Sequence, residues 1–318
     1  MRRRRIERQP QRQRRLARPV ISVGNLSMGG TGKTPMVAAI AQWLIERGEQ
    51  PAILSRGYAR ADSVDGVVVV ADRGGIRSTV DRSGDEPMML AQKVPGAIVC
   101  VSADRYLSGT LAERELGATV HILDDGFQHI ELARALDILV TTIGEIPNGN
   151  VIPRGRLREP KDAAARAQML VVSDATPGAA AAEAWALGIS QACAAIRTLG
   201  APAAVGNRQS AISNQQSRVL AIAGIANPER FASSLKEAGW NVVDSMAFND
   251  HHRYSKSDVA SICARMTSSG ATAVFTTDKD AVRFESIDVP FPLYRVPLQM
   301  QFDPAAALFG SIEAVLPQ

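Results

Sequence analysis

The chain has 318 residues and a mass of 34.0 kDa, enough for one large α/β unit or for a core domain with a smaller partner. With 46% hydrophobic and 21% charged residues, the composition excludes a largely disordered chain. No apolar run approaches the roughly 18 residues of a membrane-spanning helix, and the N-terminus lacks the apolar stretch of a secretory signal. The widely spaced Cys100, Cys193 and Cys263 indicate neither a disulfide framework nor a zinc cluster, and they favour a reducing cytoplasm.

The charge is concentrated at the N-terminus. Residues 1–18 hold nine arginines and one glutamate, so the rest of the chain is net acidic although the whole carries +4. We expect this basic segment to be mobile until it meets an anionic surface. Each arginine near an anionic leaflet contributes about 1 kcal/mol, which favours a membrane partner. Nucleic acid is the rival, but no aromatic residues are interleaved for stacking, so we expect no nucleic-acid partner. A solvated tail without function is the third interpretation.

From Pro19 onward, short apolar runs alternate with segments of helical apolar spacing. This alternation predicts an α/β fold with a mostly parallel sheet flanked by helices. The expected strands are residues 19–23, 51–55, 67–70, 97–101, 120–123, 137–142 and 169–173, with helices at 35–47 and 106–116. Segments rich in small and polar residues at 175–184 and 200–217 are typical of boundaries, and a second α/β stretch follows. We therefore predict a nucleotide-binding domain at 19–175 and a smaller α/β subdomain at 176–318 that closes the cleft.

The strongest local signal is Val23-Gly-Asn-Leu-Ser-Met-Gly-Gly-Thr-Gly-Lys-Thr34, between a predicted strand and a predicted helix. In this context backbone N–H groups and the helix N-terminus bind phosphate, and glycines let the main chain approach it. We predict that the loop binds ATP phosphates, with Lys33 at the β/γ phosphates and the Thr34 hydroxyl on Mg²⁺. The residues of the loop are Ser27, Met28, Gly29, Gly30, Thr31, Gly32, Lys33 and Thr34. The first position of the motif is Ser27 instead of glycine, and a merely structural turn is the alternative.

A pair of acids follows another apolar strand. Val120-His-Ile-Leu-Asp124-Asp125 ends in two aspartates, which is how a metal-binding carboxylate is delivered beside a phosphate loop. Two turn-forming aspartates before Gly126 are the structural alternative.

Several classes of protein share such a loop, so the loop alone does not identify a function. The membrane-associated partitioning ATPases have a lysine where this chain has Met28, which disfavours that class. The GTPase interpretation requires an Asn-Lys-x-Asp sequence, and the nearest approximation, Thr276-Thr-Asp-Lys-Asp280, lacks the leading asparagine. A membrane-associated switch or partitioning-type ATPase without a lipid acceptor is kept as the alternative function.

Further segments resemble one enzyme family. They are Ser55-Arg-Gly-Tyr58, Gly84-Asp-Glu-Pro87, Asp124-Asp-Gly-Phe-Gln-His129 and Leu157-Arg-Glu-Pro160, with Gly224–Phe231, Asp250-His251 and Thr276–Asp280 in the C-terminal half. In this order after the phosphate loop they resemble the tetraacyldisaccharide 4′-kinase (lipid A 4′-kinase) family, over residues 20 to 285. The resemblance implies a P-loop kinase-like fold and transfer of the ATP γ-phosphate to the 4′-hydroxyl of a tetraacyl glucosamine disaccharide 1-phosphate. It also implies a peripheral location at the cytoplasmic face of a Gram-negative inner membrane.

The resemblance also implies residue roles. Asp85 matches the family's catalytic aspartate and His251 the histidine that pairs with it, a combination that can relay a proton near neutral pH. Asp124 and Asp125 would organise Mg²⁺, with Glu159 as a third carboxylate. The candidates for contacting the acceptor sugar and phosphate are Arg56, Tyr58, Arg105, Gln128 and His129. Family members commonly begin with an apolar segment, where this chain has polyarginine.

The residues alone also allow structural interpretations. The segment Gly84-Asp-Glu-Pro87 could be a helix N-cap with acids in the first turn, which is a common structural use. His251 beside His252 could be a surface pair, and Arg56 and Tyr58 could be solvated residues past a strand end.

Overall fold

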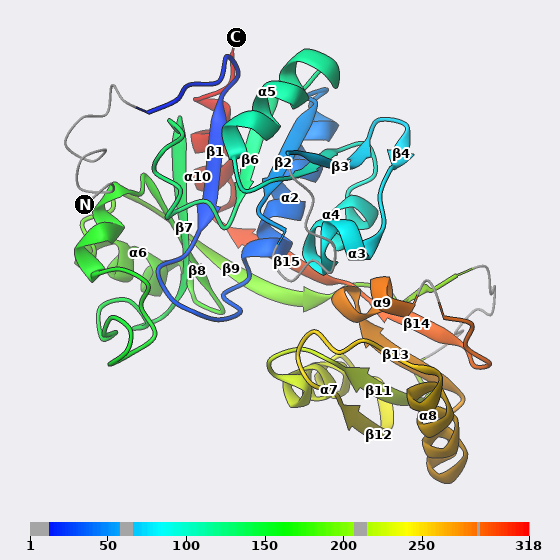
Figure 1. Ribbon diagram of the computed structural model, residues 1–318. Helices are drawn as coiled ribbons and strands as arrows, with labels where there is room; N and C mark the ends of the chain where they lie inside the picture. The colour runs from blue at the N-terminus through cyan, green and yellow to red at the C-terminus, as the bar shows by residue number, and fades with distance from the viewer. Residues whose placement is uncertain (1–12, 58–65, 207–214, 285–286, 318) are drawn as a thin grey trace. The chain divides into compact units, whose positions relative to one another are not determined.

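The computed structural model describes residues 13–57, 66–206, 215–284 and 287–317, which form two compact units (Figure 1). The larger unit extends to Arg197 and resumes at Met300, and the smaller unit is Thr198–Gln299. The boundary expected near residue 175 therefore lies inside the larger unit. The reason is that the residues after 175 form a helix that packs on the large sheet and then a further strand of that sheet. Closure of a cleft by the smaller unit stays a prediction.

A mixed but mostly parallel sheet forms the centre of the larger unit, as predicted. Among the described residues its strands are β1 (Val20–Gly24), β2 (Pro51–Ser55), β3 (Val68–Asp72), β4 (Gly75–Ile76), β5 (Ile98–Val101), β6 (Val120–Asp124), β7 (Leu136–Thr142), β8 (Met169–Ser173), β9 (Gln191–Leu199) and β15 (Leu298–Asp303). Their order is β15-β9-β8-β7-β1-β6-β2-β5-β3-β4. In this order, every adjacent pair from β9 through β5 is parallel, and β3 is antiparallel to β5.

The central strand β1 is where the chain changes direction across the sheet. It lies between β6 and β7, so the next strand, β2, is reached by crossing over β6. In sheets of this kind, ligands bind at the carboxyl ends of the strands beside such a switch point. We call this side of the sheet the carboxyl edge; β1, β6 and β7 end there at Gly24, Asp124 and Thr142. The predicted phosphate loop and aspartate pair both follow strands at this edge.

Helices cover both faces of the sheet (Figure 1). They are α2 (Lys33–Glu46), α3 (Val80–Ser83), α4 (Asp85–Lys93), α5 (Arg105–Glu115), the 3₁₀ helix η2 (Lys161–Arg166), α6 (Pro177–Ala186) and α10 (Ala305–Glu313). Strands β1, β2, β6 and β8 are buried throughout, which explains their continuous apolar runs. Ala112 of α5 packs with Ala52 and Leu54, while Ala180 of α6 packs with Leu170 and Val172.

The stretch 175–184 is mostly helix, although its composition suggested a boundary. Thr176 caps α6 by accepting a hydrogen bond from the Ala179 amide, and Pro177 follows at the first helical position. The alanines that then follow favour a helix and present a small apolar face to the sheet. Local capping and alanine content therefore outweigh the linker-like composition.

The C-terminal helix also returns to the larger unit, which the sequence did not predict. Phe309 of α10 stacks on Trp43 of α2, with ring centroids 4.8 Å apart. Arg47 at the end of α2 pairs with Glu313 at 2.6 Å.

The end of the basic segment is packed against the larger unit. Arg14 exchanges backbone hydrogen bonds with Glu131 and Ala133, and its guanidinium lies 2.6 Å from Asp104. Further along, Leu16 packs on Gly109, and the Arg18 amide binds Glu113. Residues 13–18 thus run along α5 from its first residues toward its last, so the expectation of a mobile segment reaching residue 18 is corrected here. Residues 1–12 lie outside the described residues.

The smaller unit has its own sheet and core. Its strands are β10 (Ala203–Ala204), β11 (Arg218–Ala223), β12 (Asn241–Ala247), β13 (Ala273–Thr277) and β14 (Leu293–Val296), in the order β10-β14-β13-β11-β12. Its helices are α7 (Pro228–Glu237), α8 (Lys256–Ser269) and α9 (Asp278–Phe284). β11 to β14 pair in parallel and β10 is antiparallel, so the predicted second α/β stretch is present. No described helix in either unit is long and apolar enough to cross a bilayer.

Gly24, the last residue of β1, packs closely against Phe127 in the loop after β6. A Cβ on Gly24 would lie 2.6 Å from both the backbone nitrogen and the Cβ of Phe127. Gly24→Ala should therefore push this loop away from β1 and lower the melting temperature by about 5 °C. Gly30→Ala is the matched control, because a Cβ at Gly30 meets nothing within 4 Å. Differential scanning calorimetry of both variants tests this, and equal melting temperatures would contradict it.

Candidate active site

The phosphate loop leaves β1 and enters α2 with an exposed tip and buried supports. Asn25, Ser27 and Thr31 are buried, whereas Met28, Gly29 and Gly30 are exposed. Asn25 Nδ2 donates to Thr31 Oγ1 at 3.1 Å, and Ser173 Oγ of β8 donates to the Thr31 carbonyl at 2.8 Å. Side chains therefore hold the buried part of the loop, while the glycine-rich tip is open to solvent.

Gly32 makes the turn into the helix possible. It occupies the N-cap of α2 with φ 95°, a left-handed conformation that favours glycine. The first backbone amides of α2 are thereby directed to the carboxyl edge, where a helix N-terminus attracts anions. The structure accordingly has the strand, loop and helix that the motif predicted.

A second segment lies against the phosphate loop, a contact that the sequence did not predict. Ser27 and Leu157 form an antiparallel bridge, the Met28 amide donates to the Arg156 carbonyl at 2.8 Å, and the Arg158 amide donates to the Leu26 carbonyl at 2.6 Å. The Arg156 guanidinium closes the contact by donating to the Met28 carbonyl at 2.6 Å. Residues 156–158 therefore act as a strand-like support for the loop.

Asp125 joins two cations beside this support. Lys33 Nζ lies 3.6 Å from Asp125 Oδ1, and Arg158 Nη1 lies 2.7 Å from Oδ2. Asp125 has a φ of 52°, an uncommon conformation for a residue other than glycine. The turn directs the carboxylate of the second aspartate to the lysine that the motif assigns to phosphate.

Gln128 completes this arrangement. Its Nε2 donates to the Asn25 carbonyl at 2.9 Å, and its Oε1 lies 3.3 Å from Arg158 Nη1. Both ends of the amide are thus occupied at the base of the phosphate loop. The structure gives Gln128 a supporting contact there, in addition to the acceptor-binding role implied by the resemblance.

Asp124 differs sharply from its neighbour, because it is buried. Burial, together with the nearby carboxylates of Glu86 and Asp125, raises the pKa of Asp124 to about 7, although Lys33 and Arg105 lower it. Ser55 Oγ lies 3.4 Å from one carboxylate oxygen. A buried acid crowded by other acids is an environment that a divalent cation would relieve.

The residues at this edge are suitable for binding Mg²⁺. Among the described residues, no group of three His, Cys, Asp or Glu side chains could hold a metal on its own. That agrees with Mg²⁺ chemistry, since Mg²⁺ takes much of its coordination from phosphate and water and only one or two protein carboxylates. Glu159 is buried and its Oε2 accepts from Arg166 at 2.9 Å, so part of its charge is already balanced.

Two of the predicted acceptor-binding residues lie near the aspartate pair. Arg105, the first residue of α5, is buried; burial lowers its pKa to about 10, although the charge of Asp124 raises it. Burial and then Arg105 lower the pKa of His129 to about 4, so its imidazole is neutral at physiological pH. Arg56 is exposed just past β2, and its charge acts on both residues. Tyr58 lies outside the described residues.

Asp85 is the first residue of α4, so it is one of the first-turn acids that the structural interpretation of this segment described. Gly84 occupies the N-cap, so Asp85 lies inside the first turn and is half-buried. The adjacent Glu86 is near enough to Asp124 to influence its pKa. The start of α4 therefore belongs to the same edge of the sheet as the aspartate pair.

His251 lies in the smaller unit within a polar cluster. Lys279 Nζ is 3.1 Å from His251 Nε2 and 2.9 Å from Asp250 Oδ1, and Arg283 Nη2 is 3.4 Å from His251 Nδ1. The buried Asp280 supports this cluster by accepting from the Gly224 amide at 3.0 Å. The three C-terminal motifs noted in the sequence are thus brought together at one place in this unit.

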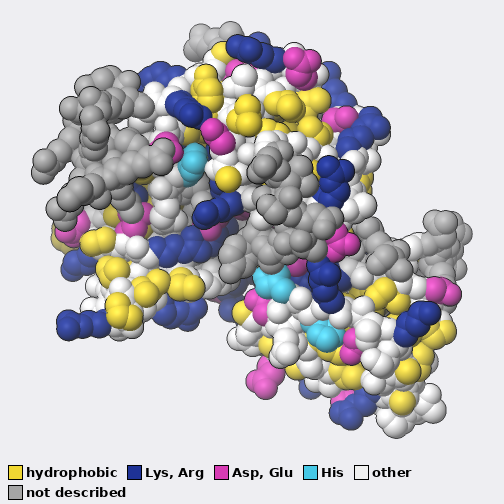
Figure 2. All heavy atoms as spheres, viewed as in Figure 1, with side chains coloured by type: hydrophobic (Ala, Val, Ile, Leu, Met, Phe, Trp, Pro, Cys, Tyr) yellow, Lys and Arg dark blue, Asp and Glu magenta, His cyan; other side chains and the backbone are white. Residues whose placement is uncertain are grey.

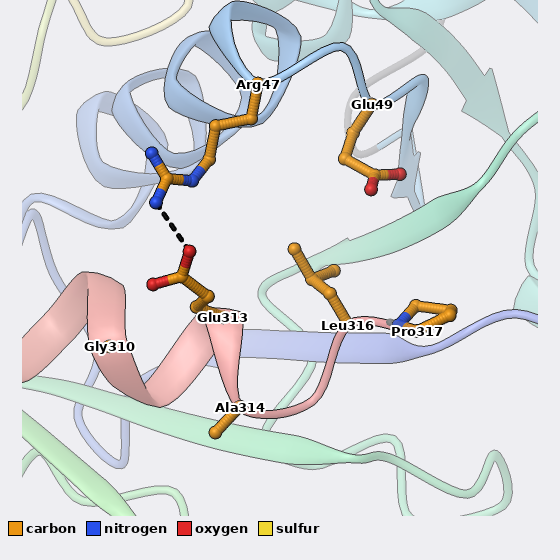
Figure 3. A pocket seen from close by; sticks show the side chains of 7 residues that line it. All are labelled: Arg47, Glu49, Gly310, Glu313, Ala314, Leu316 and Pro317. Atoms are coloured by element: carbon orange, nitrogen blue, oxygen red, sulfur yellow. Dashed lines mark hydrogen bonds and ion pairs between the residues drawn. The ribbon is translucent and has the colours of Figure 1, made fainter.

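A surface pocket of about 550 Å³ lies elsewhere (Figure 3). It is lined by Arg47, Glu49, Gly310, Glu313, Ala314, Leu316 and Pro317. Arg47 follows the last residue of α2, whereas Lys33 is its first, which separates them by about 20 Å along the helix. This pocket is therefore remote from the phosphate loop and takes no part in the site.

Comparison with known proteins now decides between the candidate classes. The family profile described as tetraacyldisaccharide-1-P 4′-kinase, LpxK, matches residues 1–316. A tetraacyldisaccharide 4′-kinase of Pelobacter propionicus is 43% identical over 275 residues, which cover 85% of this chain and 75% of the relative. Another, from Geobacter metallireducens, is 42% identical over 277 residues, covering 86% of this chain and 80% of the relative.

The chain belongs to the tetraacyldisaccharide 4′-kinase family. The structure agrees: it matches a crystal structure described as the "apo" form of LpxK from Aquifex aeolicus in complex with ATP. The TM-score is 0.80 at 28% identity, over 99% of this chain and 94% of that chain. The α/β fold, the family resemblance and the ATP-dependent kinase interpretation are confirmed, and the partitioning-type ATPase is not supported. The roles of single residues stay predictions.

The environment of Asp124 leads to a prediction about how stability depends on pH. Folding raises the pKa of Asp124, so between about pH 4 and pH 7 the folded protein holds a proton that the unfolded chain has lost. The folded state therefore loses stability as the pH rises through this range. In the absence of divalent cations, Asp124→Asn should therefore raise the melting temperature by about 4 °C or more at pH 8, and by much less at pH 5. Calorimetry at both values tests this. Equal gains at the two pH values would contradict the assignment of a buried, crowded carboxylate.

Proposed function

We propose that the phosphate loop binds the triphosphate of ATP and that its γ-phosphate passes to the 4′-hydroxyl of a tetraacyl glucosamine disaccharide 1-phosphate. The observation that carries this proposal is the convergence of Lys33, Asp125 and Arg158 on the loop beside the N-terminus of α2. A phosphate bound at this loop would lie near Lys33 and Arg158, whose shared carboxylate partner, Asp125, is only partly buried. Lys33 can exchange that partner for the β/γ phosphates, because both interactions join opposite charges.

Asp85 serves as the base in this proposal. A sugar hydroxyl has a pKa far above 7, so its proton must be accepted by a positioned group as the new O–P bond forms. A carboxylate in the first turn of α4 lies at the positive end of the helix dipole. His251 would share the proton with Asp85, as the family resemblance implies, and its imidazole is held in place by contacts with Lys279 and Arg283.

Thr34, Asp124 and Asp125 would hold Mg²⁺, with Glu159 as a further candidate. When bound, the cation neutralises phosphate charge and lowers the cost of ionising Asp124. The protein side chains do the remaining work of placing it: Ser55 orients Asp124, and Arg158 orients Asp125.

The acceptor contacts are proposed for Arg56, Arg105, Gln128 and His129, together with Tyr58. An arginine fork binds two oxygens of a phosphate at once, which suits the 1-phosphate. The neutral imidazole of His129 can exchange hydrogen bonds with sugar hydroxyls without adding charge. We also propose that the arginines of residues 1–18 hold the enzyme at the anionic cytoplasmic face of the inner membrane.

A transfer assay with radiolabelled ATP tests the reaction. The purified protein should move the γ-phosphate to the tetraacyl disaccharide 1-phosphate, and it should act poorly on a lipid-free disaccharide. ATP hydrolysis without any phosphorylated lipid would contradict the proposal.

Asp85→Asn should lower kcat by at least about 100-fold, because the base is lost, and leave ATP affinity nearly unchanged. Asp81→Asn is the control, since Asp81 is an exposed acid in the first turn of the preceding helix α3. Stopped assays give kcat, and calorimetric titration gives the ATP affinity. Normal turnover of the Asp85 variant would remove the base assignment.

His251→Ala should lower kcat by about tenfold or more at unchanged ATP affinity. The neighbouring His252→Ala is the control, because the His252 imidazole is bound to Asp258 at 3.1 Å. Equal activities of the two variants would show that His251 has no specific part in proton transfer.

A further inference from the structure

Three short segments at the carboxyl edge are joined by isolated backbone bridges. Residues 26–28 pair with residues 156–158, and Leu157 in turn pairs with residues 150–152 through its backbone. The Leu157 amide donates to the Asn150 carbonyl at 2.9 Å, and the Ile152 amide donates to the Leu157 carbonyl at 3.0 Å. Bridged backbones are about 4.8 Å apart, so Val151 lies about 10 Å from Ser27 of the phosphate loop, and Ile152 follows it in the turn.

These segments present apolar and basic side chains to solvent. The exposed fractions are 53% for Met28, 37% for Val151 and 47% for Ile152. Arg154 and Arg156 are exposed in the same turn. We call these five residues the rim patch. Between Ile146 and Glu159 the sequence holds three arginines and no acid.

Two other large hydrophobic side chains that follow carboxyl ends of strands are exposed: Leu107, in the first turn of α5, and Ile143, directly after β7. Figure 2 shows hydrophobic side chains next to Lys and Arg side chains along the lower left of the larger unit. Apolar residues that gather with cations on one edge indicate contact with a surface that is both apolar and anionic.

The described end of the basic N-terminal segment lies at the same edge. Gln13 Nε2 donates to the Ile130 carbonyl, and Arg14 binds Asp104 at the start of α5, just past the carboxyl end of β5. Residues 13–18 run from this end of α5 toward its other end. Two basic features of the chain are therefore attached to one edge.

We propose that the rim patch contacts the surface of a bilayer rich in anionic phospholipids, with Val151 and Ile152 at the acyl boundary and Arg154 at the headgroups. This rests on the proposed function only in that the enzyme must meet an acceptor that lies in a membrane. The contact places the phosphate loop next to the bilayer, so a lipid acceptor does not have to leave it completely. The patch is a second attachment, distinct from the N-terminal arginines.

Vesicle sedimentation of the full chain tests the proposal, using phosphatidylcholine vesicles with and without phosphatidylglycerol. The double variant Val151→Ser and Ile152→Ser should lower the partition coefficient on anionic vesicles by about tenfold, because two aliphatic side chains lose their apolar contact. Arg154→Gln should lower it by about fivefold, and this loss should shrink at high salt. Ile76→Ser is the matched control, since Ile76 is 47% exposed on the β3–β4 hairpin, and it should bind like the wild type.

The outcomes separate the proposal from its alternatives. Equal vesicle binding by the wild type and the double variant, with unchanged melting temperatures, would overturn it. Unchanged vesicle binding with a raised KM for the detergent-dispersed acceptor would also overturn it, and would assign the patch to the acyl chains of the acceptor. Vesicle binding does not require phosphate transfer, so the kinase proposal can fail while this one stands.

Discussion

The structure of the active site depends on one shared carboxylate. Asp125 lies between Lys33 of the phosphate loop and Arg158 of a segment more than a hundred residues later in the chain. Two conditions make this possible: β1 and β6 are neighbours in the sheet, and residues 156–158 bind the loop through their backbone. Lys33 is thus held near the place where phosphate arrives, with a partner that phosphate can replace.

Electrostatics give the two adjacent aspartates different roles. Asp125 is partly exposed and paired with cations, whereas Asp124 is buried among other acids and has a raised pKa. A cation that arrives with a nucleotide would relieve the crowding of acids at Asp124 and would also bind Asp125, which Arg158 orients. Burial, and then the charge of Arg105, lower the pKa of His129, because a charged imidazole would be poorly solvated and next to another cation.

Local sequence patterns predicted much of the fold for a physical reason. Buried parallel strands require continuous apolar runs, and β2 and β8 match their expected ranges residue for residue. The loop between β1 and α2 and the acids after β6 could also be recognised, since their chemistry depends on neighbours in sequence. The family motifs then related Asp85 and His251 to the reaction, which neither residue type nor spacing could do.

Contacts between distant segments could not be predicted in this way. Nothing local in Arg156 or Arg158 indicates that they bind the phosphate loop, and Leu16 carries no signal for its contact with Gly109. The helix α6 was missed because its alanines and glycine look like a linker until Thr176 is seen to cap it. Long-range pairing and capping geometry, rather than composition, determine these parts of the structure.

The most direct test of the central claim is the affinity for ATP when Lys33 loses its charge. Calorimetric titration of Lys33→Met should show at least about a 30-fold weaker binding of ATP with Mg²⁺, since a charge-assisted contact to phosphate is lost. Lys93→Met, at the end of α4, provides a control of the same residue type and should bind ATP like the wild type. If Lys33→Met binds ATP as tightly as Lys93→Met, the nucleotide does not use this loop, and the account of the site is wrong.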